Sequence, residues 1–348
     1  MNTGNTFYTG ENHGNYELIS LGAFQLSEGT TIPNLELAVK TRGTLNQDKS
    51  NAILIPTWYS GTTRIWEDAY IGEGRALDPS RYFIVLVNQI GNGLSTSANN
   101  APEPISGGHF PKVRIEDDVK AQYQLLTAHF GITQLELVVG GSMGAQQTYE
   151  WIVRYPDFMR KAAPIAGYAK NSEHDFIFTQ TLMDTISSDP HFKDGFYDQA
   201  EMVPALKRQG NLWNVMGYSP EMFRQKAYQA LGFDTAEAFA KGFTEEYFAV
   251  MDPNVLQTCA WKWQRGDVSR NTGGDLAAAL GRVKAKVFVM PIDHDMFFIE
   301  EDCRLEQELI PNSEFRPLKT IWGHLGLFGM HKGYLDQVDR HLKELLSL

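Results

Sequence analysis

The sequence predicts an α/β protein in which a mostly parallel sheet carries helices on both faces and is interrupted by a helical insertion. Short and almost wholly apolar segments occur at residues 52–56 and 82–88, which is the pattern of strands buried on both faces. Segments with helical spacing alternate with such strands, and this alternation favours parallel pairing. The alternation stops at residues 171–281, where the signals are mostly helical and unusually aromatic.

The elements before the insertion follow from local patterns. Two β-rich runs flank a Gly/Thr/Pro turn and predict an antiparallel start to the sheet at residues 16–26 and 34–41. Apolar residues near helical spacing predict a helix over residues 114–129, and Pro156 ends a second helix over residues 144–155. Further strands are expected at residues 135–139 and 161–165.

The alternation resumes after the insertion. Its expected elements are a strand at 283–291, a helix at 300–309, a strand at 314–321 and a helix at 335–346. We therefore expect a core of residues 1–170 and 282–348, with residues 171–281 forming a helical lid. No internal repeat or low-complexity linker is present.

Composition and charge exclude several classes of function. The net charge is −11 over 348 residues, with Lys and Arg scattered along the chain, so a nucleic acid partner is not expected. Cys259 and Cys303 are far apart and have no metal-ligand spacing, which predicts buried free thiols. The first twenty residues have no apolar segment typical of a signal peptide, and no run is long enough to cross a bilayer. We therefore expect a cytoplasmic protein without a membrane partner.

The run Gly140-Gly141-Ser142-Met143-Gly144 carries the strongest chemical signal. This G-x-S-x-G pattern alone is common, but here it lies between a predicted buried strand and a predicted helix. That strand–turn–helix setting is typical of the nucleophile in the α/β-hydrolase fold. The two outer glycines leave room for a strained backbone, and the Met143 N–H lies at a helix N-terminus where negative charge is stabilised. Ser142 is therefore predicted to form an acyl-enzyme.

A serine nucleophile needs a histidine base and an acid, which in this fold follow the serine along the chain. His324 comes directly after the expected strand at 314–321, whereas its nearest rival, His331, lies further on toward the last helix. Asp293 and Asp295 both follow the preceding strand. We favour Asp295, because an apolar segment leads from it into the next helix, and we expect Asp293 to support the loop. No further ligand cluster accompanies these aspartates, so no metal is expected.

A second oxyanion donor is expected from the loop after the strand at residues 52–56, in addition to the Met143 N–H. That loop reads Thr57-Trp58-Tyr59-Ser60-Gly61. We predict the Tyr59 N–H as the donor, with Trp58 as the next choice and as a residue that contacts substrate.

Together these residues resemble the homoserine O-acetyltransferase family of α/β-hydrolase-fold enzymes. The resemblance covers most of the chain and is strongest in five stretches: Phe110-Pro111 to Asp118-Val119, Phe130-Gly131-Ile132, Val138-Val139 to Gly144, Glu150-Trp151 and Tyr155-Pro156-Asp157. It implies the triad Ser142, Asp295 and His324. It also implies a helical lid that helps to build a homodimer, with an active-site tunnel beneath it.

Two substrate positions differ from the pattern of that family. Its members that acetylate homoserine have an aspartate directly after the catalytic histidine, where this chain has Leu325, and an arginine in the lid, where our alignment places Met183. A zwitterionic amino acid in a desolvated tunnel would leave two charges unpaired, so homoserine is not the expected acceptor.

The sequence therefore predicts a serine-dependent hydrolase of a small, weakly polar acyl ester, without a cofactor. The alternative is an acyltransferase that uses acetyl-CoA as co-substrate and an acceptor other than homoserine, because the same acyl-serine serves both reactions. A non-catalytic scaffold would lack a reactive serine. A nicotinamide-dependent enzyme is not indicated, because neither Gly72-Glu73-Gly74 nor Gly91-Asn92-Gly93 completes G-x-G-x-x-G.

Overall fold

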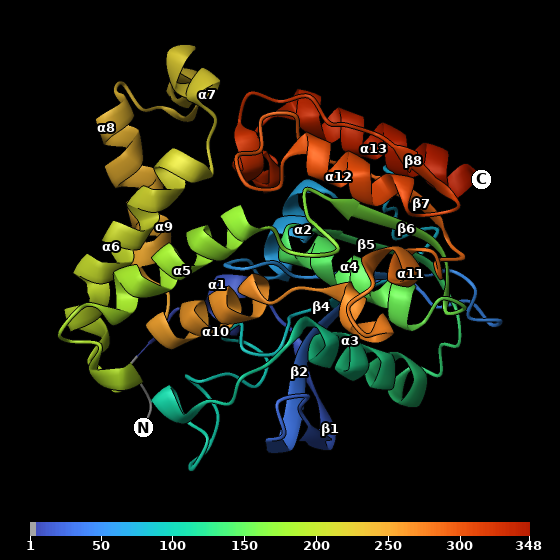
Figure 1. Cartoon of the computed structure of the whole chain (residues 1–348), viewed down its shortest axis with the longest axis horizontal. Helices are drawn as coiled ribbons and strands as arrows, with labels where there is room; N and C mark the ends of the chain where they lie inside the picture. The colour runs from blue at the N-terminus through green and yellow to red at the C-terminus, as the bar shows by residue number, and fades with distance from the viewer. Residues whose placement is uncertain (1–4) are drawn as a thin grey trace.

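A single eight-stranded sheet organises the computed structural model, which describes residues 5–348 (Figure 1). The strand order is β1-β2-β4-β3-β5-β6-β7-β8. β1 pairs antiparallel with β2 and β2 with β4, and every later pairing is parallel. The strands are β1 Glu17–Gln25, β2 Thr31–Arg42, β3 Ala52–Pro56, β4 Phe83–Val87, β5 Leu135–Gly141, β6 Met159–Ile165, β7 Lys286–Val289 and β8 Ser313–Phe315.

The predicted mostly parallel sheet with an antiparallel start is confirmed. β3 and β4 are buried at every position, as their unbroken apolar sequences indicated. The last strand is shorter than predicted: β8 ends at Phe315, and beyond it only an isolated bridge joins Leu318 to Ile292. Pro291 and Pro317 have no N–H to donate, so a regular ladder cannot continue through this region.

Helices cover both faces of the sheet, and α13 lies above it and α3 below it in Figure 1. α3 and α4 are joined by a buried hydrogen bond from Gln122 Nε2 to Gln147 Oε1. Tyr70, the residue after α2, donates a hydrogen bond from its hydroxyl to that of Tyr334 on α13. The core helices are α2 Thr63–Ala69, α3 Ile115–Gln124, α4 Met143–Arg154, α12 Glu300–Glu308 and α13 Lys332–Ser347. A short helix, α1 Gly10–His13, precedes the sheet.

A helical segment separates β6 from β7, and α5 to α9 stand to one side of the sheet in Figure 1. Its helices are α5 Glu173–Ser187, α6 Gln199–Met216, α7 Pro220–Arg224, α8 Ala236–Phe239, α9 Glu246–Ala249, α10 Pro253–Gln264 and α11 Leu276–Leu280. Side-chain caps define their starts: Ser172 accepts from the Asp175 N–H, and Asp252 caps α10, which begins with Pro253. Aromatic rings fill the interior of the segment, with Phe178 against Trp213 and Trp263.

Part of this segment returns to the core. Asn271 Nδ2 donates to both carboxylate oxygens of Glu150 on α4 at 3.1 Å. The backbones of Lys170 and Asp267 form an isolated antiparallel β-bridge. In the described part of the chain, no helix is both long enough and apolar enough to span a membrane.

Candidate active site

Ser142 lies in a sharp turn between β5 and α4 with φ 54° and ψ −124°, a conformation that a residue with a Cβ rarely adopts. Its N–H donates to the Ile165 carbonyl at 2.9 Å, which anchors the turn to β6. The flanking glycines are required by space: a Cβ on Gly140 would lie 2.2 Å from the Gly144 carbonyl oxygen, and one on Gly144 would lie 2.8 Å from the Pro56 carbonyl oxygen. The turn therefore presents the serine hydroxyl above the end of the sheet.

The structure brings Ser142, His324 and Asp295 into one hydrogen-bonded chain. His324 Nε2 lies 2.9 Å from Ser142 Oγ, and His324 Nδ1 lies 2.6 Å from Asp295 Oδ2. His324 belongs to a short 3₁₀ helix, Gly323–Phe328, which begins with Gly323 at φ 62°. A Cβ there would lie 2.9 Å from the Gly217 carbonyl oxygen, so the glycine lets the histidine loop approach the helical segment.

The second oxygen of Asp295 is also bonded. Oδ1 accepts the N–H groups of Phe297 and Phe298 at 3.1 and 3.0 Å, so the carboxylate is fixed at both ends. Asp293 faces elsewhere: its Oδ1 accepts the Thr320 N–H at 3.0 Å, and its Oδ2 lies 3.7 Å from Lys319 Nζ. Asp293 therefore braces the loop that precedes the histidine.

The side chains of this hydrogen-bonded chain are almost fully buried. The side chains of Asp295 and His324 are 0% and 4% exposed, and the ring of Phe297 lies 4.3 Å from that of His324. His331 is exposed at the start of α13. Burial strengthens the electrostatic interaction between an ionised acid and a histidine, because little water screens it.

A second buried carboxyl, Asp175 on α5, lies close enough to Asp295 for their charges to interact. Burial raises the pKa of the Asp175 carboxyl well above its usual range, and the negative charge of Asp295 raises this pKa further. Burial and the neighbouring Asp295 therefore both disfavour the ionised form of Asp175.

The residues expected to supply the oxyanion donors lie next to Ser142 in sequence or line the same pocket. Met143 is the first residue of α4, so its N–H has no partner within the helix and lies at the positive end of the helix dipole. Trp58 and Tyr59 follow β3, are buried, and line the same pocket as Ser142. The Tyr59 side chain points into the helical segment, where its hydroxyl accepts from Gln209 Nε2 and its ring stacks on Trp213 at 5.6 Å.

The pocket above Ser142 is small and mostly apolar, with a volume of about 260 Å³. Its lining residues are Trp58, Tyr59, Ser60, Ser142, Trp213, His324, Leu325, Leu327 and Phe328. Leu325 is thus brought to the site. Met183 is not among the lining residues: it lies half-buried on α5, one position beyond Leu182, which with Phe178 and Ile186 forms the buried face of that helix.

Sequence reasoning missed Ser60, Trp213, Leu327 and Phe328 as pocket residues. Leu327 and Phe328 follow His324 in the same short 3₁₀ helix. Had a helical turn been predicted after the histidine, it would have placed these two residues beside the site. Trp213 had no signal of its own, since it is one aromatic residue among many in the insertion. Its position depends on how α6 packs on the loop after β3, where the Trp213 ring stacks on Tyr59.

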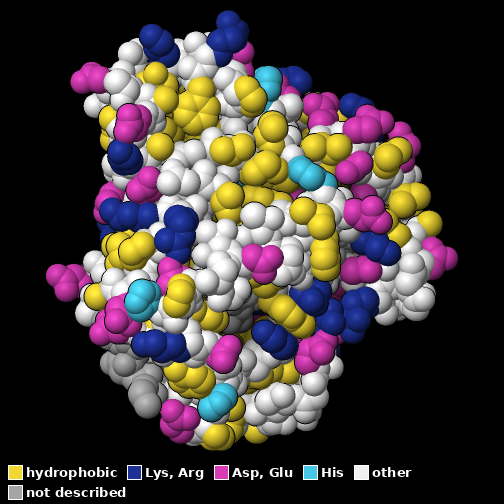
Figure 2. Space-filling model, turned by 60° about the vertical axis from the view of Figure 1, so that its left-hand side comes forward, with side chains coloured by type: hydrophobic (Ala, Val, Ile, Leu, Met, Phe, Trp, Pro, Cys, Tyr) yellow, Lys and Arg dark blue, Asp and Glu magenta, His cyan; other side chains and the backbone are white. Residues whose placement is uncertain are grey.

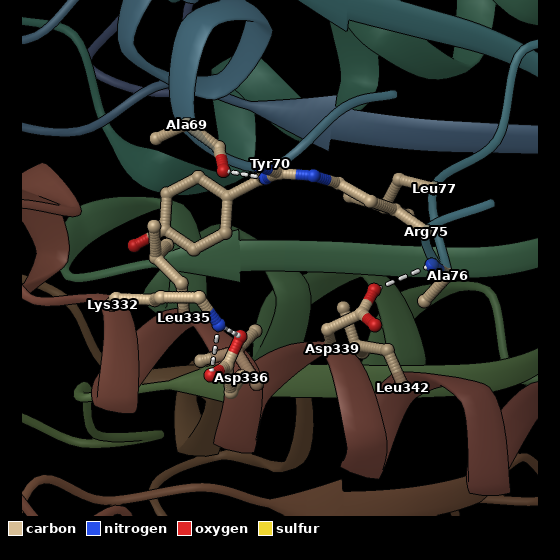
Figure 3. Close-up of a pocket in the computed structure, with 11 residues that line it drawn as sticks. Ala69, Tyr70, Arg75, Ala76, Leu77, Lys332, Leu335, Asp336, Asp339 and Leu342 are labelled. Atoms are coloured by element: carbon tan, nitrogen blue, oxygen red, sulfur yellow. Dashed lines mark hydrogen bonds and ion pairs between the residues drawn. The ribbon is translucent and has the colours of Figure 1, made fainter. Parts of the chain in front are cut away.

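A larger pocket, of about 630 Å³, lies between α13 and the loop after α2 (Figure 3). Its polar groups already pair with one another: Lys332 Nζ contacts Asp336, and Asp339 Oδ1 accepts the Ala76 N–H at 2.6 Å. It contains no serine, cysteine or histidine. Within residues 5–348, no group of three or more His, Cys, Asp or Glu side chains is placed to hold a metal ion.

The parallel sheet, the serine on a strand–turn–helix elbow, and the acid and histidine on later loops together define an α/β-hydrolase. This chain belongs to the α/β-hydrolase family, whose fold model matches residues 53–328. It is 62% identical over 344 residues to an ethyl acetate hydrolase of Pseudomonas veronii, covering 99% of each chain.

Solved structures and more distant relatives agree with this assignment. The acetyl esterase MekB superposes with a TM-score of 0.98 at 61% identity, over 99% of this chain and 100% of that one. A homoserine O-acetyltransferase of Methanococcoides burtonii is 31% identical over 356 residues, which cover 93% of this chain and 72% of the relative. The chain is thus more similar to these esterases than to this homoserine acyltransferase.

Proposed function

We propose that this protein is a carboxylic ester hydrolase that cleaves small, weakly polar acyl esters, with acetate esters of short alcohols as its substrate class. The observation that carries the proposal is the hydrogen-bonded chain from Ser142 through His324 to Asp295 under a small apolar pocket. The 62% identity to an ethyl acetate hydrolase supports the acetate ester as substrate.

In the first half-reaction, Ser142 Oγ attacks the ester carbonyl carbon while His324 Nε2 accepts the hydroxyl proton. Asp295 holds the imidazole in the required tautomer and stabilises its protonated form. The carbonyl oxygen becomes an oxyanion, which the N–H groups of Met143 and Tyr59 stabilise. The ester C–O bond then breaks, the alcohol takes the proton from His324, and the acyl group remains on Ser142.

In the second half-reaction, water attacks the acyl-serine and His324 accepts one of its protons. The tetrahedral intermediate forms at the same donors and collapses, the carboxylic acid leaves, and the proton returns to Ser142 Oγ. Every group in this cycle is a side chain or backbone amide of the chain, so the proposed reaction needs no cofactor.

Water rather than a second substrate is the proposed acyl acceptor because the pocket offers no charge to an amino acid. Leu325 is buried beside His324, at the position where the resemblance to homoserine acetyltransferases implies an aspartate. An unpaired ammonium group there would pay a large desolvation cost. The alternative remains an acetyl-CoA-dependent transfer to another alcohol or amine.

The homodimer formed through the lid, the lid boundaries at residues 171 and 281, and the cytoplasmic location stay predictions. The aromatic interior of α5 to α10 supports treating this segment as one lid unit.

The test is release of acetic acid from ethyl acetate by the purified protein, with and without acetyl-CoA and a panel of alcohols. We expect hydrolysis without acetyl-CoA, and a loss of at least about 10⁴-fold in kcat for Ser142→Ala. Release of CoA that requires an acceptor, with no hydrolysis of ethyl acetate, would replace the hydrolase with the transferase.

A further inference from the structure

Two buried glutamine side chains hold the backbone of the loop at residues 57–61. Gln89 Nε2 donates to the Trp58 carbonyl at 2.8 Å, and Gln147 Nε2 donates to the Thr57 carbonyl at 2.9 Å. Both glutamines are fully buried. Two successive peptides of the loop that is expected to supply the second oxyanion donor are therefore hydrogen-bonded to buried side chains.

The orientation of the Gln89 amide is set by Lys262 on α10. An ammonium group has three N–H donors and no acceptor. Lys262 Nζ donates to Gln89 Oε1 at 3.0 Å, to the Ile90 carbonyl at 2.7 Å and to Asp118 Oδ2 at 2.5 Å. Because Lys262 can only donate, the oxygen of Gln89 must face it, and the NH₂ group must face Trp58.

Asp118 on α3 completes this buried network. Its Oδ1 accepts the Ile90 N–H at 2.8 Å, and the side chains of Asp118 and Lys262 are both 0% exposed. A buried ion pair adds little net stability, because desolvation offsets much of the attraction between the charges. Stability alone therefore does not explain why this pair is buried, whereas orienting the Gln89 amide gives it a role.

The peptide between Trp58 and Tyr59 links this network to the oxyanion. The bond is trans, and in a trans peptide the C=O and the following N–H point in opposite directions. We propose that Gln89 is a positioning residue that holds the Tyr59 N–H toward the oxyanion by binding the Trp58 carbonyl, with Lys262 and Asp118 orienting Gln89. This inference rests on the proposed hydrolase function.

The network also joins the lid to the site. Lys262 belongs to the segment between β6 and β7, whereas Gln89 follows β4 and Asp118 lies on α3. The oxyanion donor is thus correctly aimed only while α10 is docked on the core.

The test compares Gln89→Met with Gln147→Met. Both changes remove a buried amide of the same size that binds a carbonyl of the same loop. Gln89 binds the Trp58 carbonyl, which shares a peptide with the Tyr59 N–H, whereas Gln147 binds the Thr57 carbonyl, one peptide earlier. The readouts are kcat and KM for ethyl acetate, and the Ki of a short trifluoromethyl ketone. This ketone forms a tetrahedral adduct on a serine nucleophile, so its oxygen samples the oxyanion hole.

For Gln89→Met we expect kcat to fall and Ki to rise, each by about 10- to 100-fold, with KM changed by less than about threefold. Loss of one oxyanion donor costs about 10²- to 10³-fold in kcat, and a misaligned donor costs less. For Gln147→Met, which leaves the bond from Gln89 to the Trp58 carbonyl in place, we expect the changes in kcat and Ki to be at least about threefold smaller than in Gln89→Met. An equal loss in both variants, or no loss in Gln89→Met, overturns the proposal.

If Gln89→Met does not fold, Gln89→Glu serves instead, because it keeps the shape and the contact with Lys262 but cannot donate to Trp58 when ionised. The same rise in Ki is expected, and an unchanged Ki overturns the proposal. A wild-type protein that neither hydrolyses esters nor binds the ketone would instead refute the proposed function. A wild type that does both, with variants that match it, refutes the positioning role alone.

Discussion

Leu325 follows directly after His324, so its side chain determines the polarity of the pocket wall beside the reacting atoms. The residue is 5% exposed, and its N–H donates to the Gly217 carbonyl of the helical segment at 3.0 Å. The side chain packs so closely on Gly217 that a Cβ there would lie 2.9 Å from Leu325 Cδ1. The wall is thus rigid and apolar, which favours a small ester over a charged acceptor.

Leu325→Ala should therefore widen the pocket and change the preferred acyl length. One methylene in an apolar pocket is worth about 1 to 3 kcal/mol in discrimination. We expect the ratio of kcat/KM for p-nitrophenyl butyrate to that for p-nitrophenyl acetate to rise by about tenfold or more. Steady-state assays with both esters measure it.

Leu305→Ala is the matched control for this prediction, since Leu305 lies on α12 and is 54% exposed. The ratio should not change in this variant. An unchanged ratio in Leu325→Ala would show that Leu325 does not limit the acyl group.

Single residues of the site differ in how well the sequence predicts them. Ser142, Asp295 and His324 were predicted because each follows a strand, in a fixed order along the chain. Gln89 and Lys262 carry no motif, since an isolated glutamine or lysine in a buried segment acquires its partner only when distant elements pack. Met183 was assigned by alignment and not by a motif of its own, and its contact with substrate stays a prediction.

At the scale of elements, α12 is anchored to the loop after β6 by one buried carboxyl. Glu306 Oε2 accepts the Ala169 N–H at 2.8 Å, and Oε1 accepts the Lys170 N–H at 2.9 Å. Burial raises the pKa of Glu306 to about 8, although these two bonds lower it, and the charges of Asp302 and Asp267 raise it. The folded chain therefore keeps this carboxyl protonated at pH values where the unfolded chain has released the proton.

This shift predicts that Glu306 makes the free energy of unfolding fall as pH rises between about 5 and about 8. The folded pKa is above the ordinary value, so the contribution to stability is greatest at low pH and is lost as pH approaches 8. Glu306→Gln imitates the protonated form at every pH. Its stability relative to wild type should increase across this window, by on the order of 4 kcal/mol.

Urea unfolding of both proteins at several pH values measures this difference. A constant difference between them across the window would contradict the raised pKa of Glu306.

Elements were predicted well where burial determines the sequence. β3 matches its expected range, because a central strand buried on both faces must be apolar throughout. β8 lies beside β7 at the edge of the sheet and was predicted too long, because periodicity does not show that its pairing ends near Pro317. α2 was missed because it has only seven residues, and its buried Trp66 packs on Trp58 and Tyr70, contacts that form only in the folded chain.

At the scale of the whole molecule, the exposed apolar side chains are concentrated on the helical segment. Half of the large hydrophobic residues that are exposed lie between residues 173 and 253, and they are Phe176, Ile177, Phe196, Val215 and Val250. Figure 2 shows hydrophobic side chains in the middle of this face with charged groups around them. An apolar centre with a charged rim is typical of a surface that binds another protein.

The homodimer implied by the resemblance would cover this surface. Ile177 on α5 and Val215 on α6 are 62% and 69% exposed, on helices that pack together. A stable interface buries about 800 Å² on each partner, and a charge at its apolar centre is strongly unfavourable. We expect the wild-type protein to have twice the 39.2 kDa of one chain in sedimentation equilibrium at micromolar concentration, and the double variant Ile177→Asp/Val215→Asp to have the mass of one chain.

Leu18→Asp is the control for this prediction, because Leu18 is similarly exposed, at 50%, but lies on β1 outside the helical segment. This variant should remain a dimer, since the same change in charge falls outside the predicted interface. A monomeric wild type would refute the dimer. If Leu18→Asp dissociates the dimer and the lid double variant does not, the interface lies at the edge of the sheet and not on the lid.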